Sequence, residues 1–203
     1  MAPDHSLVLP TFAQPLELHT KRCVLRQWKD SDLPAWAAMN ADAEVRRYFP
    51  SVASVEQALG EAQRCRDAIA QRGWGMWALE VPGVMPFAGF VGLNAPHYDA
   101  PWIPAVEIGW RLTRAAWGQG LATEAAQAAL GGHDNEQMHL ILAGADQQWG
   151  GALPAGDTYI DVGQHARHAL GIAVLAASAD LRATGHRVPR RFGPFYGGIG
   201  THT

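Results

Sequence analysis

The sequence predicts an α/β fold of the mixed α+β kind, with a largely antiparallel sheet and helices on its faces. Three strand-like segments follow one another between residues 74 and 112, with no helical segment between them. Helical periodicity is confined to the segments before and after them, whereas a doubly wound fold alternates strands and helices throughout. A chain of 203 residues with 48% hydrophobic residues is long enough to bury one core.

The N-terminal part contains two short strand segments and a first helix. Residues 16–20 and 23–28 have strand character and are joined by a Thr-Lys-Arg turn. Ser31 or Asp32 is expected to cap a helix that runs from about residue 33 to residue 40, because proline is tolerated in a first helical turn.

A second helix has clearer signals. Ser54 and Gln57 form a capping box at its start, and Gly73 is expected to end it. Apolar residues recur at spacings of three and four, which is typical of a helix with one buried face: Val55, Ala58, Leu59, Ala62, Cys65 and Ile69. Cys65 therefore belongs to the buried stripe, and a structural role is preferred to a reactive one.

Three strands are expected next, at residues 74–81, 87–93 and 105–112. Pro82–Gly83 separates the first two as compactly as a hairpin turn would. Residues 94–104 contain three prolines and are expected to form a longer loop.

The stretch from Val106 to Ala125 is the most informative part of the chain. Apolar residues alternate with Glu107, Gly109 and Arg111, which is strand alternation. A turn containing Gly118 and Gly120 then leads into a helix that extends to about residue 130. Glycines at such a turn let backbone N–H groups approach an anion, and the helix start adds its positive dipole end. The first hypothesis is therefore a ligand that carries phosphate.

Composition excludes several other classes of protein. A net charge of −3 argues against a general nucleic-acid binder, which usually presents a basic face. Two cysteines are too few for a disulfide framework. The N-terminus lacks the pattern of a signal peptide, and no apolar run has membrane-spanning length. We therefore expect a soluble cytoplasmic protein with no nucleic-acid or membrane partner, as a monomer or homodimer.

Over residues 16–130 the chain resembles the GNAT acetyltransferases, in particular the branch of the ribosomal-protein-alanine N-acetyltransferases. The resemblance is carried by motifs in a fixed order rather than by a lone Gly-x-Gly. In this sequence they read Arg-Cys-Val-Leu-Arg at 22–26, Asp-Ser-Asp-Leu at 30–33, Gly-Phe-Val-Gly-Leu at 89–93, Glu-Ile-Gly-Trp at 107–110 and Trp-Gly-Gln-Gly-Leu-Ala-Thr-Glu-Ala at 117–125.

The resemblance implies a GNAT-like fold that transfers an acetyl group from acetyl-CoA, as co-substrate, to a primary amine without a metal. The turn would hold the CoA pyrophosphate through backbone N–H groups, and the preceding strand would pair with the pantetheine arm along a free edge. The cofactor-binding residues so implied are Ile108, Trp110, Leu112, Trp117, Gly118, Gln119, Gly120, Leu121 and Ala122. The family often has Gln or Arg at the position of Ala115, and this chain does not.

Amine acetylation requires a base, because an ammonium must lose a proton before its nitrogen attacks a thioester. Glu107 is the candidate catalytic base; the alternative is a solvated carboxylate or one paired with Arg111. Tyr48 and Phe49 lie where the family has its acceptor-side loop, so they are the candidate substrate-binding residues. Trp110 and Trp117 favour a packing role over substrate stacking.

A second group of side chains has more than one interpretation. Glu124 either complements the helix dipole or contacts ligand. Three histidines, His139, His165 and His168, lack the carboxylate or cysteine that would complete a metal site, so none is expected. Tyr159 and Tyr196 are equally eligible to protonate the CoA thiolate, and nothing in the sequence selects between them.

The sequence divides into three parts. Residues 1–15 are expected to form an arm, residues 16–130 an acetyl-CoA-binding core, and residues 131–203 a divergent C-terminal part. That last part holds 13 of the 22 glycines and lacks the family's later motifs. Residues 139–143 can supply one strand and residues 166–183 one helix, and a fusion or frame change would explain the divergence.

Two further functions stay open beside the acetyltransferase. One is a non-catalytic CoA-binding or regulatory module that has lost its C-terminal catalytic elements. The other is a nucleotide-binding domain, which is weaker because neither a Gly-x-Gly-x-x-Gly motif nor a P-loop lysine is present.

Overall fold

The structure is a computed structural model that describes residues 9–95, 106–130 and the backbone of 170–176. These residues form one six-stranded sheet in which every strand pairs antiparallel with the next along the chain. The strands are β1 (Leu18–His19), β2 (Val24–Arg26), β3 (Met76–Val81), β4 (Met85–Asn94), β5 (Val106–Leu112) and β6 (Leu170–Ala176). The predicted mixed fold with a largely antiparallel sheet is confirmed.

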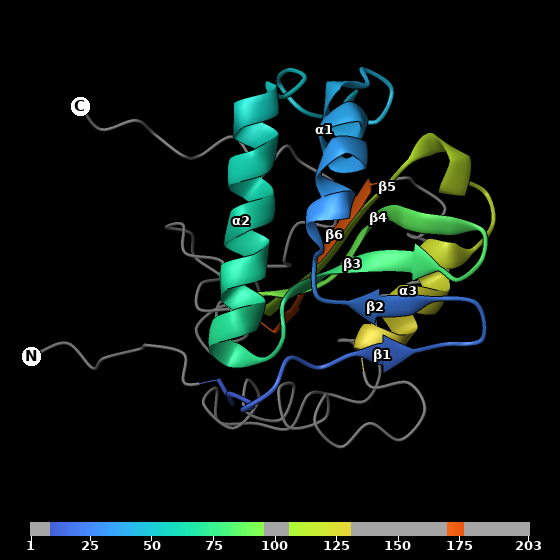
Figure 1. Cartoon of the computed structure of the whole chain (residues 1–203). Coiled ribbons are helices and arrows are strands. Elements are labelled where there is room, and N and C mark those ends of the chain that lie inside the picture. Colours follow the sequence, from blue (N-terminus) through green and yellow to red (C-terminus); the bar gives the residue numbers. More distant parts are fainter. Residues whose placement is uncertain (1–8, 96–105, 131–169, 177–203) are drawn as a thin grey trace, which may run out of the picture.

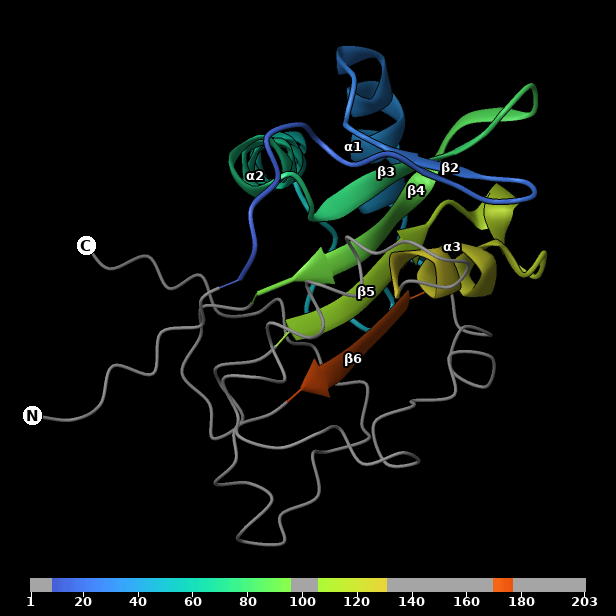
Figure 2. The ribbon, with the colours of Figure 1, turned by 90° about the horizontal axis from the view of Figure 1, so that it is seen from below.

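Helices cover both faces of this sheet. They are α1 (Leu33–Ala41), α2 (Val55–Arg72) and α3 (Leu121–Ala129), with two single 3-10 turns, η1 (Asp30–Asp32) and η2 (Arg114–Ala116). Helices α1 and α2 lie side by side on one face, and α3 lies behind the strands on the other (Figure 1). Figure 2 shows the same arrangement from below, with β6 at the edge of the sheet beside β5.

Helix α2 begins and ends at the expected residues. The Ser54 hydroxyl accepts a hydrogen bond from the Gln57 N–H, and the Gln57 side chain accepts one from the Ser54 N–H. Gly73 ends the helix in the left-handed region, at φ +85°. The buried stripe is narrower than predicted, because Val55 is 62% exposed and Leu59 39%. Burial raises the pKa of the Cys65 thiol to about 12, consistent with the structural role expected.

Helix α1 has the expected bounds but not the expected cap. Asp32 occupies the N-cap position, yet its side chain makes no capping hydrogen bond to α1. Its carboxylate instead accepts the Lys29 N–H at 2.8 Å and two N–H groups of the buried Arg26 at 2.8 and 3.0 Å. Asp32 therefore joins β2 to the start of α1.

Aromatic side chains fill the core between α1 and the sheet. Trp36 packs edge-on against Trp28 at 5.1 Å and lies 5.3 Å from the Phe90 ring. The indole N–H of Trp36 donates to the Ala58 carbonyl and that of Trp28 to the Met76 carbonyl, so both rings are buried without an unsatisfied donor.

Two glycines mark where backbones turn or approach closely. Gly83 lies at φ +74° in the β3–β4 hairpin, as Pro82–Gly83 predicted, and a Cβ there would meet nothing within 4 Å. At Gly92 a Cβ would lie 2.0 Å from the Gly75 carbonyl oxygen. The chain before β3 thus approaches β4 more closely than any side chain permits.

Residues 9–15 are bound to the core, contrary to the expected arm. The Phe12 N–H donates to the Arg72 carbonyl at 3.0 Å, and the Trp74 indole donates to the Pro10 carbonyl at 2.9 Å. Phe12 and Leu9 also pack, half-buried, on the core. This segment therefore closes the C-terminal end of α2.

The C-terminal part supplies a strand where a helix was expected. Residues 170–176 form β6, so the predicted helix over 166–183 is wrong there. The segment is a short continuous apolar run, a pattern that fits a strand as well as a helix. Its β-branched residues, Ile172 and Val174, favour the strand. The expected strand at 139–143, the three histidines and both candidate tyrosines lie outside the described residues.

Candidate functional site

The site is built around the connection between β5 and α3. Gly118 and Gly120 both lie in the left-handed region, at φ +72° and +73°. The first amide of α3 with a partner inside the helix is that of Glu124, which donates to the Gly120 carbonyl at 3.1 Å. The amides before it point out of the helix start, as in any α-helix. A Cβ at Gly118 would meet nothing within 4 Å, so the turn is open to a ligand.

The β1–β2 turn holds this connection from the side. The Arg22 guanidinium donates to the Glu124 carboxylate at 2.7 Å and to the Gln119 carbonyl at 2.8 Å. The Arg22 N–H and the Thr20 hydroxyl also donate to Glu124, at 2.8 and 2.6 Å. Partial burial works to raise the pKa of Glu124, but these hydrogen bonds outweigh it and the pKa is lowered.

Glu107 lies on β5 and is buried, with 3% of its surface exposed. The Asn94 amide on β4 donates to its carboxylate at 2.8 Å, across the pair that the strand register makes. Burial raises the pKa of Glu107 and the Asn94 hydrogen bond partly offsets this, leaving the pKa above its ordinary value. The interpretation as a solvated surface carboxylate is wrong, because the carboxylate is not exposed.

Arg111 lies on the same face of β5 as Glu107, four residues along the strand. It is fully buried and its guanidinium contacts Asn40 at 2.7 Å and Glu61 at 3.1 Å, on α1 and α2. The Phe49 ring lies 4.7 Å from this guanidinium. Phe49 is thus half-buried over the Glu107 face, whereas Tyr48 is 52% exposed.

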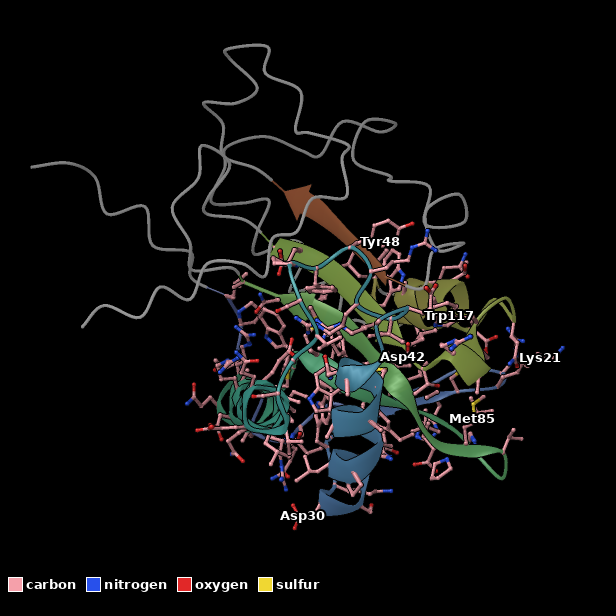
Figure 3. All side chains as sticks on the ribbon, turned by 90° about the horizontal axis from the view of Figure 1, so that it is seen from above. Lys21, Asp30, Asp42, Tyr48, Met85 and Trp117 are labelled. Atoms are coloured by element: carbon pink, nitrogen blue, oxygen red, sulfur yellow. The ribbon has the colours of Figure 1, made fainter. Side chains whose placement is uncertain are left out.

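The loop after α1 also contacts the connection that leads to the turn. The Asp42 carboxylate lies 3.8 Å from the Arg114 guanidinium of η2, and both side chains are partly exposed. Figure 3 shows Asp42 and Trp117 at the end of α1 away from Asp30. The loop that follows α1 therefore lies next to the connection that leads to the candidate phosphate turn.

The other predicted cofactor-binding residues are mostly buried. Ile108, Trp110, Leu112, Leu121 and Ala122 each have less than 5% of their surface exposed. Any contact of theirs with a ligand must therefore use the backbone.

The side chains of the turn itself pack back onto the chain. The Trp117 indole donates to the Leu112 carbonyl at 2.9 Å, and the Gln119 amide donates to the Ala115 carbonyl at 2.6 Å. These contacts agree with a packing role for Trp117.

Strand β5 has neighbours on both edges. It pairs with β4 from Glu107 to Leu112 and with β6 from Val106 to Arg111. The expected free edge beside Ile108 and Trp110 is therefore covered by β6, and only Leu112 extends beyond this pairing. A ligand backbone cannot pair with Ile108 or Trp110 in this arrangement.

Asn94, Thr20 and the role of Arg22 were not predicted. Each is recognised through a partner distant in sequence: Asn94 lies 13 residues from Glu107, and Thr20 lies 104 residues from Glu124. The pairing of Asn94 with Glu107 could have been predicted only from the register of β4 against β5. The long connection between these strands leaves that register open.

The described residues offer neither a metal-binding cluster nor a membrane-spanning helix. No group of three or more His, Cys, Asp or Glu that could hold a metal ion lies within 9–95, 106–130 or 170–176. None of the helices in these ranges combines the length and apolar character needed to cross a membrane.

Comparison with known proteins identifies a matching family. The model of the acetyltransferase (GNAT) domain matches residues 22–148, which include β2 to β5, α3 and the glycine turn. An acetyltransferase from Agrobacterium tumefaciens has the same fold, with a TM-score of 0.50 and 21% identity over 70% of this chain and 86% of that chain.

Two other solved structures match more loosely. A GNAT-family acetyltransferase from Bacillus anthracis is 22% identical with a TM-score of 0.46; the match covers 57% of this chain and only 64% of that chain. RimL, described as a ribosomal L7/L12 alpha-N-protein acetyltransferase in complex with coenzyme A, is 17% identical with a TM-score of 0.45, over 81% of this chain and 100% of that chain.

Proposed function

Because this chain belongs to the GNAT acetyltransferase family, we propose that it transfers an acetyl group from acetyl-CoA to a primary amine, such as a peptide α-amino group or a small amine. The observation that carries this proposal is the open turn at Gly118 and Gly120 at the start of α3. Acetyl-CoA supplies an activated acyl group as a thioester, and it is the second substrate.

The turn is suited to the CoA pyrophosphate. Amides from Gly118 to Ala122 are expected to donate to phosphate oxygens, aided by the dipole of α3. Leu112 provides the end of β5 that is clear of β6, so contacts with the pantetheine arm are expected there. Contacts with Ile108 and Trp110 require β6 to leave the edge of β5.

Glu107 is proposed as the base that accepts the proton of the ammonium, directly or through water. A raised pKa brings a carboxylate closer to the pKa of the amine and makes it a better proton acceptor. Phe49 and Tyr48 are proposed to line the acceptor side, since Phe49 lies over the same face of β5.

A non-catalytic CoA-binding module is the second candidate, and one observation favours it. The pairing of β6 with β5 covers the edge that a pantetheine arm would use during catalysis. Such a protein would still bind the phosphates of CoA at the turn but would not release CoA from acetyl-CoA. The leading proposal also includes membership of the ribosomal-protein-alanine acetyltransferase-like branch, a cytoplasmic location and a monomeric or homodimeric state.

Binding and turnover of acetyl-CoA separate the two candidates. Isothermal titration with CoA measures binding, and a thiol reagent measures CoA released in the presence of peptides and small amines. Binding with thiol release supports the acetyltransferase, and binding without release on any amine supports the module. No binding of CoA would overturn both.

Gly118→Leu is the sharpest variant for the turn. The position has open space, so the added side chain enters the ligand volume rather than the core. Gly83→Leu is the matched control, because Gly83 has nearly the same φ and equally open surroundings but lies in the β3–β4 hairpin. We expect CoA binding to be lost only in Gly118→Leu; equal binding by both variants would place the ligand elsewhere.

A further inference from the structure

Arg22 and Glu124 join two segments that are 102 residues apart in the sequence. We propose that Arg22 is a positioning residue of the CoA-binding turn: it neutralises Glu124 and fixes the Gln119 carbonyl, so that the start of α3 can accept a phosphate. This inference rests on the proposed function. It assigns a role in ligand binding to the β1–β2 turn, which otherwise looks like a simple strand connection.

The contacts of Arg22 reach both sides of the glycine turn. Its side chain binds the carbonyl of Gln119, which lies between the two glycines, and the carboxylate of Glu124 in the first turn of α3. A Cβ at Gly120 would lie 3.6 Å from a terminal nitrogen of the same guanidinium. Arg22 therefore borders the turn as well as tying it to β1 and β2.

The negative charge of Glu124 means that its contact with Arg22 affects the binding of an anionic ligand. Glu124 lies four residues into α3, about 6 Å along the axis from the helix start. A bare carboxylate at that distance would repel a phosphate and would compete for the same positive end of the helix dipole. The Arg22 guanidinium, at 2.7 Å, offsets that charge.

The β1–β2 turn that carries Arg22 is itself held in position by hydrogen bonds. The Thr20 hydroxyl accepts the Cys23 N–H at 2.8 Å, which closes the β1–β2 turn, while it donates to Glu124 at 2.6 Å. Because the turn is closed on itself, Arg22 is presented to α3 in one orientation. The Arg22 side chain is 44% exposed, so it is accessible to a ligand as well as to Glu124.

Three variants test this role by titration with CoA: Arg22→Gln, Glu124→Gln and the double variant. Removing Arg22 alone leaves the Glu124 charge beside the turn, so we expect Kd to rise about tenfold. Removing Glu124 alone deletes the repulsive charge, so Kd should change less than about threefold. The double variant should bind CoA more tightly than Arg22→Gln, because the uncompensated carboxylate is gone.

A purely structural ion pair gives a different pattern. Both single variants would then weaken CoA binding to the same extent, and the double variant would not recover; that result would overturn the proposal. Arg22→Lys keeps the charge and should restore part of the affinity lost in Arg22→Gln. In turnover, KM for acetyl-CoA should rise while kcat stays within about twofold.

A variant at a second ion pair is the control for an effect on folding. Arg66→Gln removes the Arg66–Asp30 contact, which is 2.8 Å long compared with 2.7 Å for Arg22–Glu124. Figure 3 shows Asp30 at the end of α1 away from Trp117, which precedes the glycine turn. If Arg22→Gln and Arg66→Gln have similar Tm without ligand, the loss of affinity is not a loss of folded protein. Wild-type protein that fails to bind CoA overturns the proposed function and this inference together, whereas normal binding by Arg22→Gln overturns this inference alone.

Discussion

The Asn94 amide and the Glu107 carboxylate face each other across β4 and β5, with 2.8 Å between the amide nitrogen and a carboxylate oxygen. This contact supplies a hydrogen bond to a buried carboxylate whose pKa burial has raised. It therefore tunes the proton affinity of the proposed base without adding a charge.

Replacing Asn94 with alanine should move the pH dependence of catalysis. The Asn94 hydrogen bond lowers the pKa of Glu107, so its removal raises that pKa further. A base works only when deprotonated, and the acidic limb of kcat/KM should therefore shift to higher pH. The measurement is a pH profile of thiol release; an unmoved acidic limb would show that Glu107 is not the base.

Glu107→Gln should lower activity and raise stability. Turnover at neutral pH should fall by about 100-fold, the effect of losing one general base. The raised pKa means that folding favours the protonated carboxyl, so stability is lost as the pH rises from the unfolded pKa to the folded one. The neutral glutamine avoids this loss, so Tm at pH 7 should rise above that of the wild type.

The stability of Glu107→Gln is compared with that of a surface variant. Glu17→Gln alters an exposed carboxylate paired with His19 and should change Tm little. A Tm for Glu107→Gln at or below that of the wild type would show that the buried carboxylate is not destabilising.

Arg26→Met should destabilise the fold strongly. Arg26 is buried and donates to the Asp32 carboxylate and to the Pro86 carbonyl. Removing it leaves Asp32 buried without its cation, which costs about 3–5 kcal/mol. Urea denaturation measures the loss. Lys29→Gln is the control, since Lys29 lies 3.5 Å from Glu80 at the surface and its loss should cost less than about 1 kcal/mol.

Two glycines should respond differently to alanine. Gly92→Ala would place a Cβ against the Gly75 backbone, so β3 and β4 must separate and we expect no folded protein. Gly83→Ala meets no atoms and costs only the left-handed conformation, about 1–2 kcal/mol. Circular dichroism with thermal melts separates the two; a folded Gly92→Ala protein would mean that the strands are less closely packed than described.

Proline in β6 tests whether this strand limits ligand access to β5. Adjacent residues of an antiparallel strand point their N–H groups alternately toward and away from the partner strand. Only one of Ile172→Pro and Ala173→Pro therefore removes a bond to β5, and the other is its control. We expect the disruptive variant to bind CoA about fivefold more tightly. Equal affinities would show that CoA does not use this edge.

Local signals predicted the parts of the fold that depend on neighbouring residues. The Ser54 capping box and Gly73 set the bounds of α2, and Pro82–Gly83 set the hairpin. These features need only contacts a few residues apart, so a short stretch of sequence contains the whole cause.

The environment of β5 could not be predicted in the same way. Alternation correctly placed Glu107 and Arg111 on one face, but that face is covered by α1 and α2 rather than by water. Arg111 can be buried because Asn40 and Glu61, 71 and 50 residues away, accept hydrogen bonds from its guanidinium. Such partners are recognisable only after the fold is known. The prediction for the apolar run at 170–176 failed for another reason, since periodicity does not separate a buried strand from a buried helix.

The order of strands in the sheet has a consequence for how this protein tolerates change. Strands β1 to β5 each pair with the next along the chain, and all their pairing residues precede residue 113. No residue beyond α3 is therefore needed to form these strand pairs. Among the described strands only β6, on the outer edge of β5, comes from the chain beyond α3. Changes of sequence beyond residue 130 can thus accumulate while strands β1 to β5 and the glycine turn still fold.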